Sequence, residues 1–553
     1  MDRNTLLAFL LIGLIILLWP VWMRKVVGTK EPIRETIAES EEQQSEILEE
    51  SQTPQPVSSS EETLKARKEP SRRIEASSIT RGVRPDTIVV ETDFYRGLLS
   101  SAGGGTILSW KLKKYLKGEK EDRKWVELIP DSAEGNMGLV MGVDLSRIVF
   151  DVEYDTLGET KEYKFVHDLS DGRRVEKEFH VLPNSYHIEM LVRLVSFRRD
   201  EIGEAYSVQW KSGLQPTEKN VKDDLHYYEA YALQGGELLK SKGDSKTQTG
   251  DTEWVAVRTK YFLVALIPKE PLGMAAKLRG EKIEIAYRED GLKEDWRRYH
   301  VQLDMPFRGQ LEETARFALY LGPMDYQQLR SYDVKLEKMM NFGWMIIRPF
   351  SIGFFYALQR IHGIVHNYGW AIIIFSILIK VVLYPLTRKS YQSMRKMQEL
   401  QPKMAALKEK YKKDPQKMNQ ETMKLYKQHG VNPMGGCLPL LLQMPVLFAL
   451  FNLFRTTIML RQASFLGGLI KDLSAPDAML PIRGGINLLP ILMAATMIIQ
   501  QKLATQNPQQ KAMAYFMPVF LMFIFYRLSA GLNLYYLMFN VLTILQEMII
   551  RKK

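Results

Sequence analysis

The sequence has one cysteine and eight histidines among its 553 residues. The single thiol, Cys437, cannot form an intramolecular disulfide, and one chain cannot build a cysteine metal site around it. The histidines are scattered and lack the spacing of metal ligands. We therefore predict that the chain binds no metal and no cofactor, and that its polar part folds without covalent cross-links.

Motifs that carry catalysis are also missing. Three glycines from Gly103 precede a threonine, but the run lacks the spacing and the Lys-Ser/Thr end of a phosphate-binding loop, so we predict a tight turn. No nucleophile elbow and no paired acid and base stand out. We predict that no residue is catalytic and that the chain is not an enzyme. The alternative is an enzyme that acts on a sugar, because some β-sandwich domains resemble mutarotases.

Acidic residues are almost absent from the long apolar runs, which lie mostly between about residue 341 and the end. Residues from about 30 to 340 are polar and charged. The formal net charge is +11, and lysines and arginines lie next to the apolar runs. Such cations orient membrane spans and attract anionic lipids, so we predict a multi-pass membrane protein before a nucleic-acid-binding one.

An apolar run at residues 368–388 is long enough to span a bilayer and contains Lys380. This lysine precedes Arg388 by about 12 Å along a helix. A cation at that depth costs about 2.5–3.5 kcal/mol, unless it faces a wet cavity, finds a partner or extends to the headgroups. Ser376 and Tyr384 lie four residues before and after it on the same helix face, which predicts a polar stripe.

The N-terminal half combines one span with a β domain. Residues 6–23 are apolar and lack a small-residue cleavage site, which predicts an uncleaved helix with a cytoplasmic N-terminus. The following residues are rich in Glu, Ser and Gln, which predicts a flexible tether. Apolar and polar residues then alternate at 186–194, and 254–268 resembles a strand pair or one long buried strand. We predict a large β-sandwich.

Residues 326–367 mix aromatic side chains with arginines, which predicts an amphipathic helix in the membrane interface. The alternative is a helix packed under the β domain. After the Lys380 span, apolar residues recur at three- and four-residue steps from Met394 to Tyr411, which predicts one amphipathic helix. Asp414 then begins a second helix that Gly430 ends.

This hairpin carries twelve lysines and arginines against four acids, an excess that places it in the cytoplasm. Four more apolar runs follow at 438–454, 486–499, 513–526 and 532–550. The middle two are about 21 Å long as helices, which predicts local thinning of a roughly 30 Å bilayer core. Polar residues in these runs predict a shared hydrated pocket, with hydrogen bonds between helices as the alternative. An ion-coupled transporter is the alternative function.

Several ordered motifs resemble the YidC family of membrane protein insertases, whose relatives include the mitochondrial Oxa and chloroplast Albino proteins. The resemblance covers about residues 342–553, and the β domain is similar to the periplasmic domain of Gram-negative members at 87–115 and 254–268. The motifs are Tyr384-Pro-Leu-Thr, Met394-Arg-Lys-Met-Gln-Glu-Leu-Gln-Pro, Asn432-Pro-Met-Gly-Gly-Cys-Leu-Pro, Gln443-Met-Pro, Phe516-Met-Pro and Gly531-Leu-Asn-Leu-Tyr-Tyr.

The resemblance implies an α-helical polytopic membrane protein with six transmembrane helices, a five-helix insertase core and an all-β periplasmic sandwich domain. It implies an insertase and chaperone of the cell inner membrane, with both termini cytoplasmic. The chain would insert and help to fold newly made membrane proteins, alone or with the Sec translocon. The implied partners are nascent membrane proteins, Sec components and the ribosome, with no nucleic acid other than ribosome contact.

The resemblance also implies a hydrophilic groove open to the cytoplasm and to lipid, in which Lys380 stands where the family has an arginine. A lysine keeps the charge but loses the two-pronged hydrogen bonding of arginine. Arg527 replaces an aromatic residue that many members carry after the fifth span. The predicted groove residues are Lys380, Ser376, Gln443, Tyr536, Tyr384 and Met444. The predicted recruitment residues of the hairpin are Arg395, Lys396, Met397, Lys403 and Lys408.

These predictions divide the chain into seven segments. They are an N-terminal transmembrane helix at 1–28, a disordered acidic linker at 29–83, a periplasmic β-sandwich domain at 84–325, an interfacial helix with the entry to the second span at 326–367, the second transmembrane helix at 368–387, the cytoplasmic hairpin at 388–431, and transmembrane helices three to six with a basic tail at 432–553.

Overall fold

The computed structural model describes residues 84–118, 123–131, 135–169, 171–286, 293–412, 414–430, 438–479, 485–504 and 508–552. Apart from residues 260–263, the described chain divides into a strand-rich unit up to residue 321 and a helical unit from residue 322 onward. The predicted span at 6–23 and the predicted linker at 29–83 lie outside the described residues.

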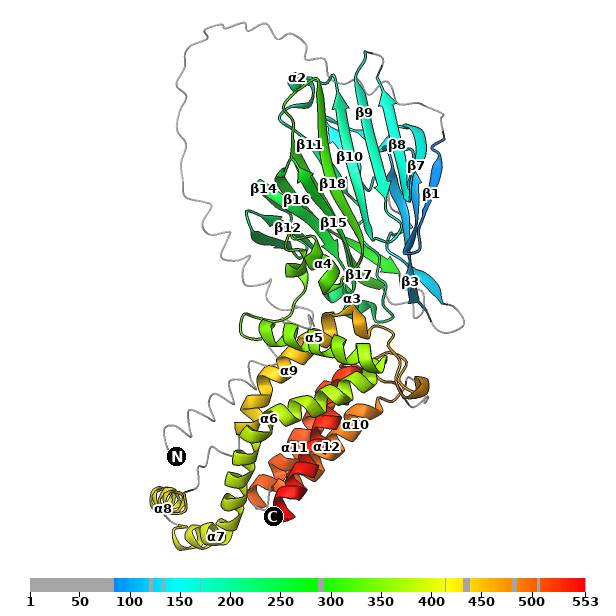
Figure 1. Ribbon diagram of the computed structural model, residues 1–553. Helices are drawn as coiled ribbons and strands as arrows, with labels where there is room; N and C mark the ends of the chain where they lie inside the picture. Colours follow the sequence, from blue (N-terminus) through cyan, green and yellow to red (C-terminus); the bar gives the residue numbers. More distant parts are fainter. Residues whose placement is uncertain are drawn as a thin grey trace, which may run out of the picture. The chain divides into compact units, whose positions relative to one another are not determined.

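The strand-rich unit contains two sheets (Figure 1). A small sheet has the order β1-β2-β3-β4, and a 14-stranded sheet has the order β6-β5-β11-β17-β16-β14-β15-β18-β10-β9-β8-β7, with β12 paired to β13 and β14. The strands are β1 (Thr87–Glu91), β2 (Tyr95–Ser100), β3 (Thr106–Lys117), β4 (Lys124–Glu127), β5 (Gly138–Met141), β6 (Val143–Asp144), β7 (Asp151–Leu157), β8 (Thr160–Asp168), β9 (Arg174–Val181), β10 (His187–Val195), β11 (Ala205–Trp210), β12 (Glu229–Gln234), β13 (Glu237–Ser241), β14 (Lys246–Arg258), β15 (Phe262–Glu270), β16 (Gly273–Ala286), β17 (Lys293–Pro306) and β18 (Glu312–Pro323). The predicted β-rich domain is confirmed.

The period-2 pattern predicted from residue 186 is found in β10. Its apolar residues from Ile188 to Leu194 are at most 2% exposed at every second position, and Glu189 between them is exposed. β10 pairs with β18 on one side and β9 on the other, so one face of this strand lies in the core. The segment at 254–268 is the strand pair of the two predicted options, because β14 ends at Arg258 and β15 begins at Phe262.

The three glycines after Ala102 form the predicted tight turn, between β2 and β3. Gly103, Gly104 and Gly105 have φ angles of +72°, +64° and +85°, which side chains with a Cβ rarely adopt. A buried lysine on β9 holds the turn in place: the Lys177 ammonium donates to the carbonyl oxygens of Gly103 at 3.2 Å and Met137 at 2.6 Å. Burial of this amine lowers the pKa of Lys177 to about 7.

Lys177 makes the stability of the strand-rich unit depend on pH. The unfolded chain holds the lysine proton up to about pH 10.5 and the folded unit only to about pH 7, so the unfolded state binds more protons between these values. The free energy of unfolding therefore rises with pH across this window, and the burial cost is fully present below it. We expect Lys177→Met to flatten this rise, measured as hydrogen exchange of β9 in the full-length protein. An equal rise in the variant and the wild type would contradict this account.

The helical unit contains α4 (Tyr326–Ser331), α5 (Arg348–Val365), α6 (Tyr368–Glu399), α7 (Gln401–Lys410), α8 (Pro415–Gln428), α9 (Leu438–Thr456), α10 (Leu488–Ala504), α11 (Pro508–Phe525) and α12 (Ala530–Lys552). Among the described residues, the segments Tyr368–Pro385 of α6 and Ala530–Ile550 of α12 are long and apolar enough to cross a membrane. Leu488–Lys502 and Tyr515–Phe525 are shorter apolar segments. The count of six spans therefore stays a prediction.

Helix α5 crosses one end of the bundle and packs against α6 and α9 (Figure 1). Phe355 and Leu358 on one side are buried, whereas Phe350 and Ile364 are 47% and 79% exposed. Tyr326 of α4 stacks edge-on against Phe355, so the two helices share a small aromatic core. The exposed apolar side chains agree with the predicted amphipathic character of this segment.

The predicted hairpin is present, but its first arm is not one helix. α6 continues from the predicted span to Glu399, and α7 begins at Gln401 after a break at Leu400. The single helix predicted across this point was wrong, because Pro402 has no N–H to continue the hydrogen bonding of α6 and lies instead in the first turn of α7. Leu400 and Tyr426 nevertheless form the buried centre of the hairpin, with the Tyr426 hydroxyl 3.1 Å from the sulfur of Met404.

Asp414 caps α8 as predicted, since its carboxylate accepts a 3.0 Å hydrogen bond from the Lys417 N–H. We expect Asp414→Ala to lower the local stability of α8 by about 1 kcal/mol. Faster hydrogen exchange in the first turn of α8 would report the loss. Glu409→Ala is the matched control because it removes the same charge from an exposed position in α7. Equal changes in the two variants would assign the effect to net charge and not to the cap.

Candidate functional site

Helix α6 brings Lys380 into the interior of the helical unit. The Asn367 carboxamide begins the helix by accepting hydrogen bonds from the N–H groups of Gly369 and Trp370, at 2.9 and 3.3 Å. Gly369 allows close approach of Phe465, because a Cβ at this position would lie 2.1 Å from the ring. The start of α6 is thereby fixed against the loop that contains Phe465, and the positions of the residues further along the helix follow from it.

Lys380 is 7% exposed and has partners on α12. Its ammonium donates a 2.7 Å hydrogen bond to the Thr543 hydroxyl and lies 4.7 Å from the centre of the Phe539 ring. Thr543 donates its own proton to the Phe539 carbonyl at 2.8 Å, which leaves its oxygen available as an acceptor. Of the three options that the sequence left for this cation, the structure agrees with a partner inside the bundle and not with extension to the surface.

The polar stripe predicted on α6 is only partly continuous. Ser376 is fully buried, but its hydroxyl donates to the Ile372 carbonyl of its own helix at 2.7 Å. Tyr384 is 41% exposed and so lies off the buried face, whereas Thr387, one turn beyond, is 4% exposed. The buried face thus passes through Lys380 to Thr387 and not to Tyr384.

Helix α12 supplies several other buried polar groups. The Gln546 carboxamide donates to the Thr387 hydroxyl at 3.3 Å, and Asn540 donates to the Thr496 hydroxyl of α10 at 3.4 Å. Asn533 donates to the Phe525 carbonyl at the end of α11, at 3.1 Å. For the asparagines of this helix, the alternative of hydrogen bonds between helices is therefore confirmed.

The remaining predicted groove residues lie on two helices. Gln443 and Met444 are on α9 and are partly exposed. Tyr536 is on α12, 8% exposed, with its ring edge-on to Phe525 at 5.2 Å. Since α9 and α12 both contact α6, all six predicted residues belong to one bundle, and direct contact with Lys380 comes from α12.

Sequence reasoning missed Thr387, Thr543 and Gln546 as members of this cluster. A signal for Thr543 was present, because Phe539, Thr543 and Glu547 recur at four-residue steps and so share one helix face. Helix α12 packs against α6 in the bundle, and the hydrogen bond from Lys380 to Thr543 shows that this face meets α6.

Comparison with known proteins identifies the family. The C-terminal part, residues 360–553, matches the family model described as 60Kd inner membrane protein, and residues 87–352 match that of the YidC periplasmic domain. Membrane protein insertase YidC of Chlorobium phaeovibrioides is 36% identical over 99% of this chain and 94% of its own. The chain belongs to the YidC family of membrane protein insertases. The YidC protein of Chlorobaculum parvum is 37% identical over 99% of this chain and 94% of its own.

A crystal structure of an active YidC insertase with its first transmembrane domain resolved is 21% identical to this YidC-family chain. It covers 84% of this chain and 93% of its own, with a TM-score of 0.38. The two family matches together account for the strand-rich unit and the helical unit, so the resemblance noted in the sequence is confirmed for both halves.

The hairpin of this YidC-family chain presents most of its predicted recruitment residues to solvent. Lys396 and Lys408 are exposed, and Lys403 lies 3.0 Å from His429 across the hairpin. Met397 packs against the buried centre of the hairpin, so it supports the surface more than it forms it. Arg395 donates to the Ile550 carbonyl at 3.1 Å and pairs with Glu399 at 3.6 Å, which ties α6 to the end of α12.

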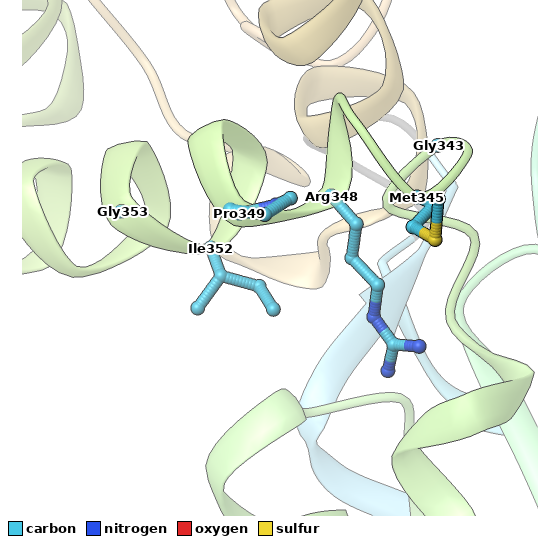
Figure 2. Close-up of a pocket in the computed structure, with 6 residues that line it drawn as sticks. All are labelled: Gly343, Met345, Arg348, Pro349, Ile352 and Gly353. Atoms are coloured by element: carbon cyan, nitrogen blue, oxygen red, sulfur yellow. The ribbon is translucent and has the colours of Figure 1, made fainter.

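An open hollow of about 730 Å³ lies where α5 begins, away from Lys380. Figure 2 shows that Arg348 and Ile352 project from the same side of the helix start, and that Gly343 and Met345 approach from the preceding loop. The lining thus combines one arginine with apolar side chains and glycines.

The periplasmic domain contains one group of side chains with potential metal-ligand atoms among its described residues. The ligand atoms of Glu162, Glu178 and His180 lie within 4.8 Å of one another on β8 and β9. The His180 ring nitrogen is already 2.6 Å from the Glu178 carboxylate, so a hydrogen bond accounts for this arrangement without an ion. That the chain binds no metal stays a prediction.

Proposed function

We propose that this chain inserts and helps to fold newly made inner-membrane proteins through a hydrophilic groove centred on Lys380. The observation that carries the proposal is the buried ammonium of Lys380 among apolar helices. It contacts Thr543 and Phe539, which both lie on α12. A membrane protein seldom retains such a charge without a functional reason, because it is costly in the hydrocarbon layer. Membership of an insertase family supports the same conclusion.

The groove would act by replacing water around a polar substrate segment. The Lys380 ammonium and the Thr543 hydroxyl offer a donor and an acceptor where lipid offers neither. A short polar tail could then cross without losing its entire hydration, while the apolar part of the substrate moves sideways into lipid. Burial of that apolar part at about 25 cal/mol per Å² provides the driving force, and no covalent step is needed.

The hairpin would recruit the substrate or its source. Its exposed lysines, which include Lys396 and Lys408, are suited to the phosphates of a ribosome, and its methionines to a nascent helix. The Sec translocon is the proposed second partner for larger substrates. Arg348 and the apolar surface of α5 would contact anionic lipids on the other side of the membrane.

The proposed topology has six spans, cytoplasmic termini and a periplasmic β domain. Continuity of α6 into a basic hairpin supports a cytoplasmic C-terminal end of this helix. The short apolar segments of α10 and α11 support a locally thin bilayer beside the groove.

An ion-coupled transporter has less support. Lys380 and Glu547 are buried groups of opposite charge in the helical unit, which such a transporter could use. However, the chain belongs to an insertase family along its whole length. For the β domain, no paired acid and base stand out in the sequence that would support a sugar-directed enzyme activity.

The deciding experiment uses proteoliposomes that contain only this protein. A short membrane protein with an acidic tail is added, and protection of the tail from an external protease is measured against empty liposomes. Protection above the empty control supports insertion by this chain alone. Protection that needs added Sec components would support the cooperative route, and none under either condition would reject the proposal.

A further inference from the structure

The face of α12 that meets Lys380 carries three side chains at four-residue steps. Phe539 and Thr543 contact the ammonium, and Glu547 is the next residue on the same face. One turn of helix separates the Thr543 and Glu547 positions by about 6 Å. Glu547 is only 7% exposed, so its carboxylate is directed into the bundle and away from solvent.

Gln546, the residue before Glu547, fixes the rotation of α12 about its own axis near the end of the helix. The Gln546 carboxamide donates to the Thr387 hydroxyl of α6, and both side chains are buried. Because Thr387 lies two turns beyond Lys380 on α6, the same contact aligns the two helices along their length. A rotation of α12 that carried Glu547 outward would break this hydrogen bond.

A buried carboxylate needs a cation close by, since an isolated charge is costly in a medium of low polarity. The negative charge of Glu547 acts on Lys380 across the α6–α12 contact. Arg395, another cation on α6 near the end of α12, is already engaged with Glu399 and with the Ile550 carbonyl.

We propose that Glu547 is the resident counter-ion of Lys380 and that an acidic segment of a substrate has to displace it. This inference rests on the proposed function, because it assumes that Lys380 receives polar groups of the substrate. In the resting protein the pair keeps the bundle neutral at this depth. When an acidic tail enters, its carboxylate and Glu547 compete for one ammonium, and repulsion between the two acids limits how long the tail stays.

The exchange gives Glu547 a role in specificity. It lowers the affinity for every acidic segment and thereby prevents the cation from becoming a trap. It leaves segments without charge unaffected, since these can bind Thr543 and Lys380 without displacing the carboxylate. Glu547 is thus a specificity-determining residue that acts through Lys380.

A charge exchange in the full-length protein tests the pair without any substrate. Lys380→Glu should lower the thermal unfolding midpoint in detergent because two carboxylates then face one another, and Glu547→Lys should lower it because two cations do. The double variant with both changes should recover at least half of the summed loss. A double variant that loses as much as the two single variants together would overturn the assignment.

Displacement is tested with two substrates that differ only in the tail, one with aspartates and one with asparagines. In proteoliposomes, Glu547→Gln should raise photo-crosslinking of the acidic tail near Lys380 relative to the neutral tail by about fivefold or more. Glu399→Gln is the matched control, because it removes the same charge from an exposed position of α6. An equal rise in both variants would overturn the displacement step.

The two tests separate this inference from the proposed function. Recovery in the charge exchange together with no insertion by the wild type would reject the insertase proposal and support the counter-ion. Insertion by the wild type without recovery in the charge exchange would support the insertase proposal and reject the counter-ion.

Discussion

Lys380→Ala should reduce insertion of a short protein with an acidic tail to the level of empty liposomes. The substitution removes the one buried cation that contacts Thr543 and Phe539, and it leaves Glu547 buried with its partner gone. An acidic tail would then meet an alanine where the ammonium had been, and it would be repelled by the negative charge of Glu547. The measurement is protease protection of the tail in proteoliposomes that contain equal amounts of each protein. An unchanged pattern of limited trypsin digestion confirms that the variant is folded.

Lys380→Arg is the matched variant because it keeps the charge and changes only its shape. Arginine is the residue that the family resemblance places here, so we expect retention of insertion and stronger binding of carboxylates through two hydrogen bonds. Equal insertion by the alanine variant and the wild type would remove Lys380 from the mechanism. It would leave the assignment to an insertase family unchanged.

Gly105→Ala should destabilise the periplasmic domain by about 2–5 kcal/mol. A left-handed conformation costs about 1–2 kcal/mol for a residue with a Cβ, and forced overpacking adds about 1–3 kcal/mol. At Gly105, φ is +85° and the new Cβ would lie 2.3 Å from the Phe179 ring and 2.9 Å from that of Phe165. The two rings are held edge-on to each other with centroids 5.8 Å apart, so neither can retreat without disturbing the other.

Gly172→Ala separates the two contributions. Gly172 also has a φ of +85°, but a Cβ there meets no atom within 4 Å. We expect a loss of about 1–2 kcal/mol from this variant, the backbone term alone. Denaturant unfolding of full-length protein, followed by hydrogen exchange of β8 and β9, measures both. Equal losses would show that Phe165 and Phe179 can rearrange at no cost.

Features that depend on neighbouring residues were predicted well from the sequence. The alternation in β10, the glycine turn at Gly103 and the cap at Asp414 each follow from the chemistry of a few consecutive residues. The break at Leu400 had an equally local signal in Pro402, but the methionine periodicity across it outweighed that signal. Such a period can continue on both sides of a break because the two helices share one apolar centre.

The partners of Lys380 could not be predicted in this way. The hydrogen bond to Thr543 joins residues 163 positions apart, and the one from Gln546 to Thr387 joins residues 159 positions apart. Such contacts depend on which faces of α6 and α12 meet and at what height, and one turn of displacement would pair different residues. Tyr384 is a second example. Its four-residue spacing from Lys380 predicted a position on the same helix face, but the packing of α6 in the bundle leaves it exposed.

The continuity of α6 gives the protein a mechanical property. Lys380 and Arg395 lie on one helix, about 22 Å apart along its axis, without a loop between them. A helix resists twisting, so a torque applied to the hairpin turns the lysine as well. Pro385 interrupts the backbone hydrogen bonding five residues after Lys380 and gives the rod a point of easy bending. Rotation of the hairpin about the helix axis is therefore transmitted to Lys380. Tilting of the hairpin bends α6 at Pro385 and does not reach Lys380.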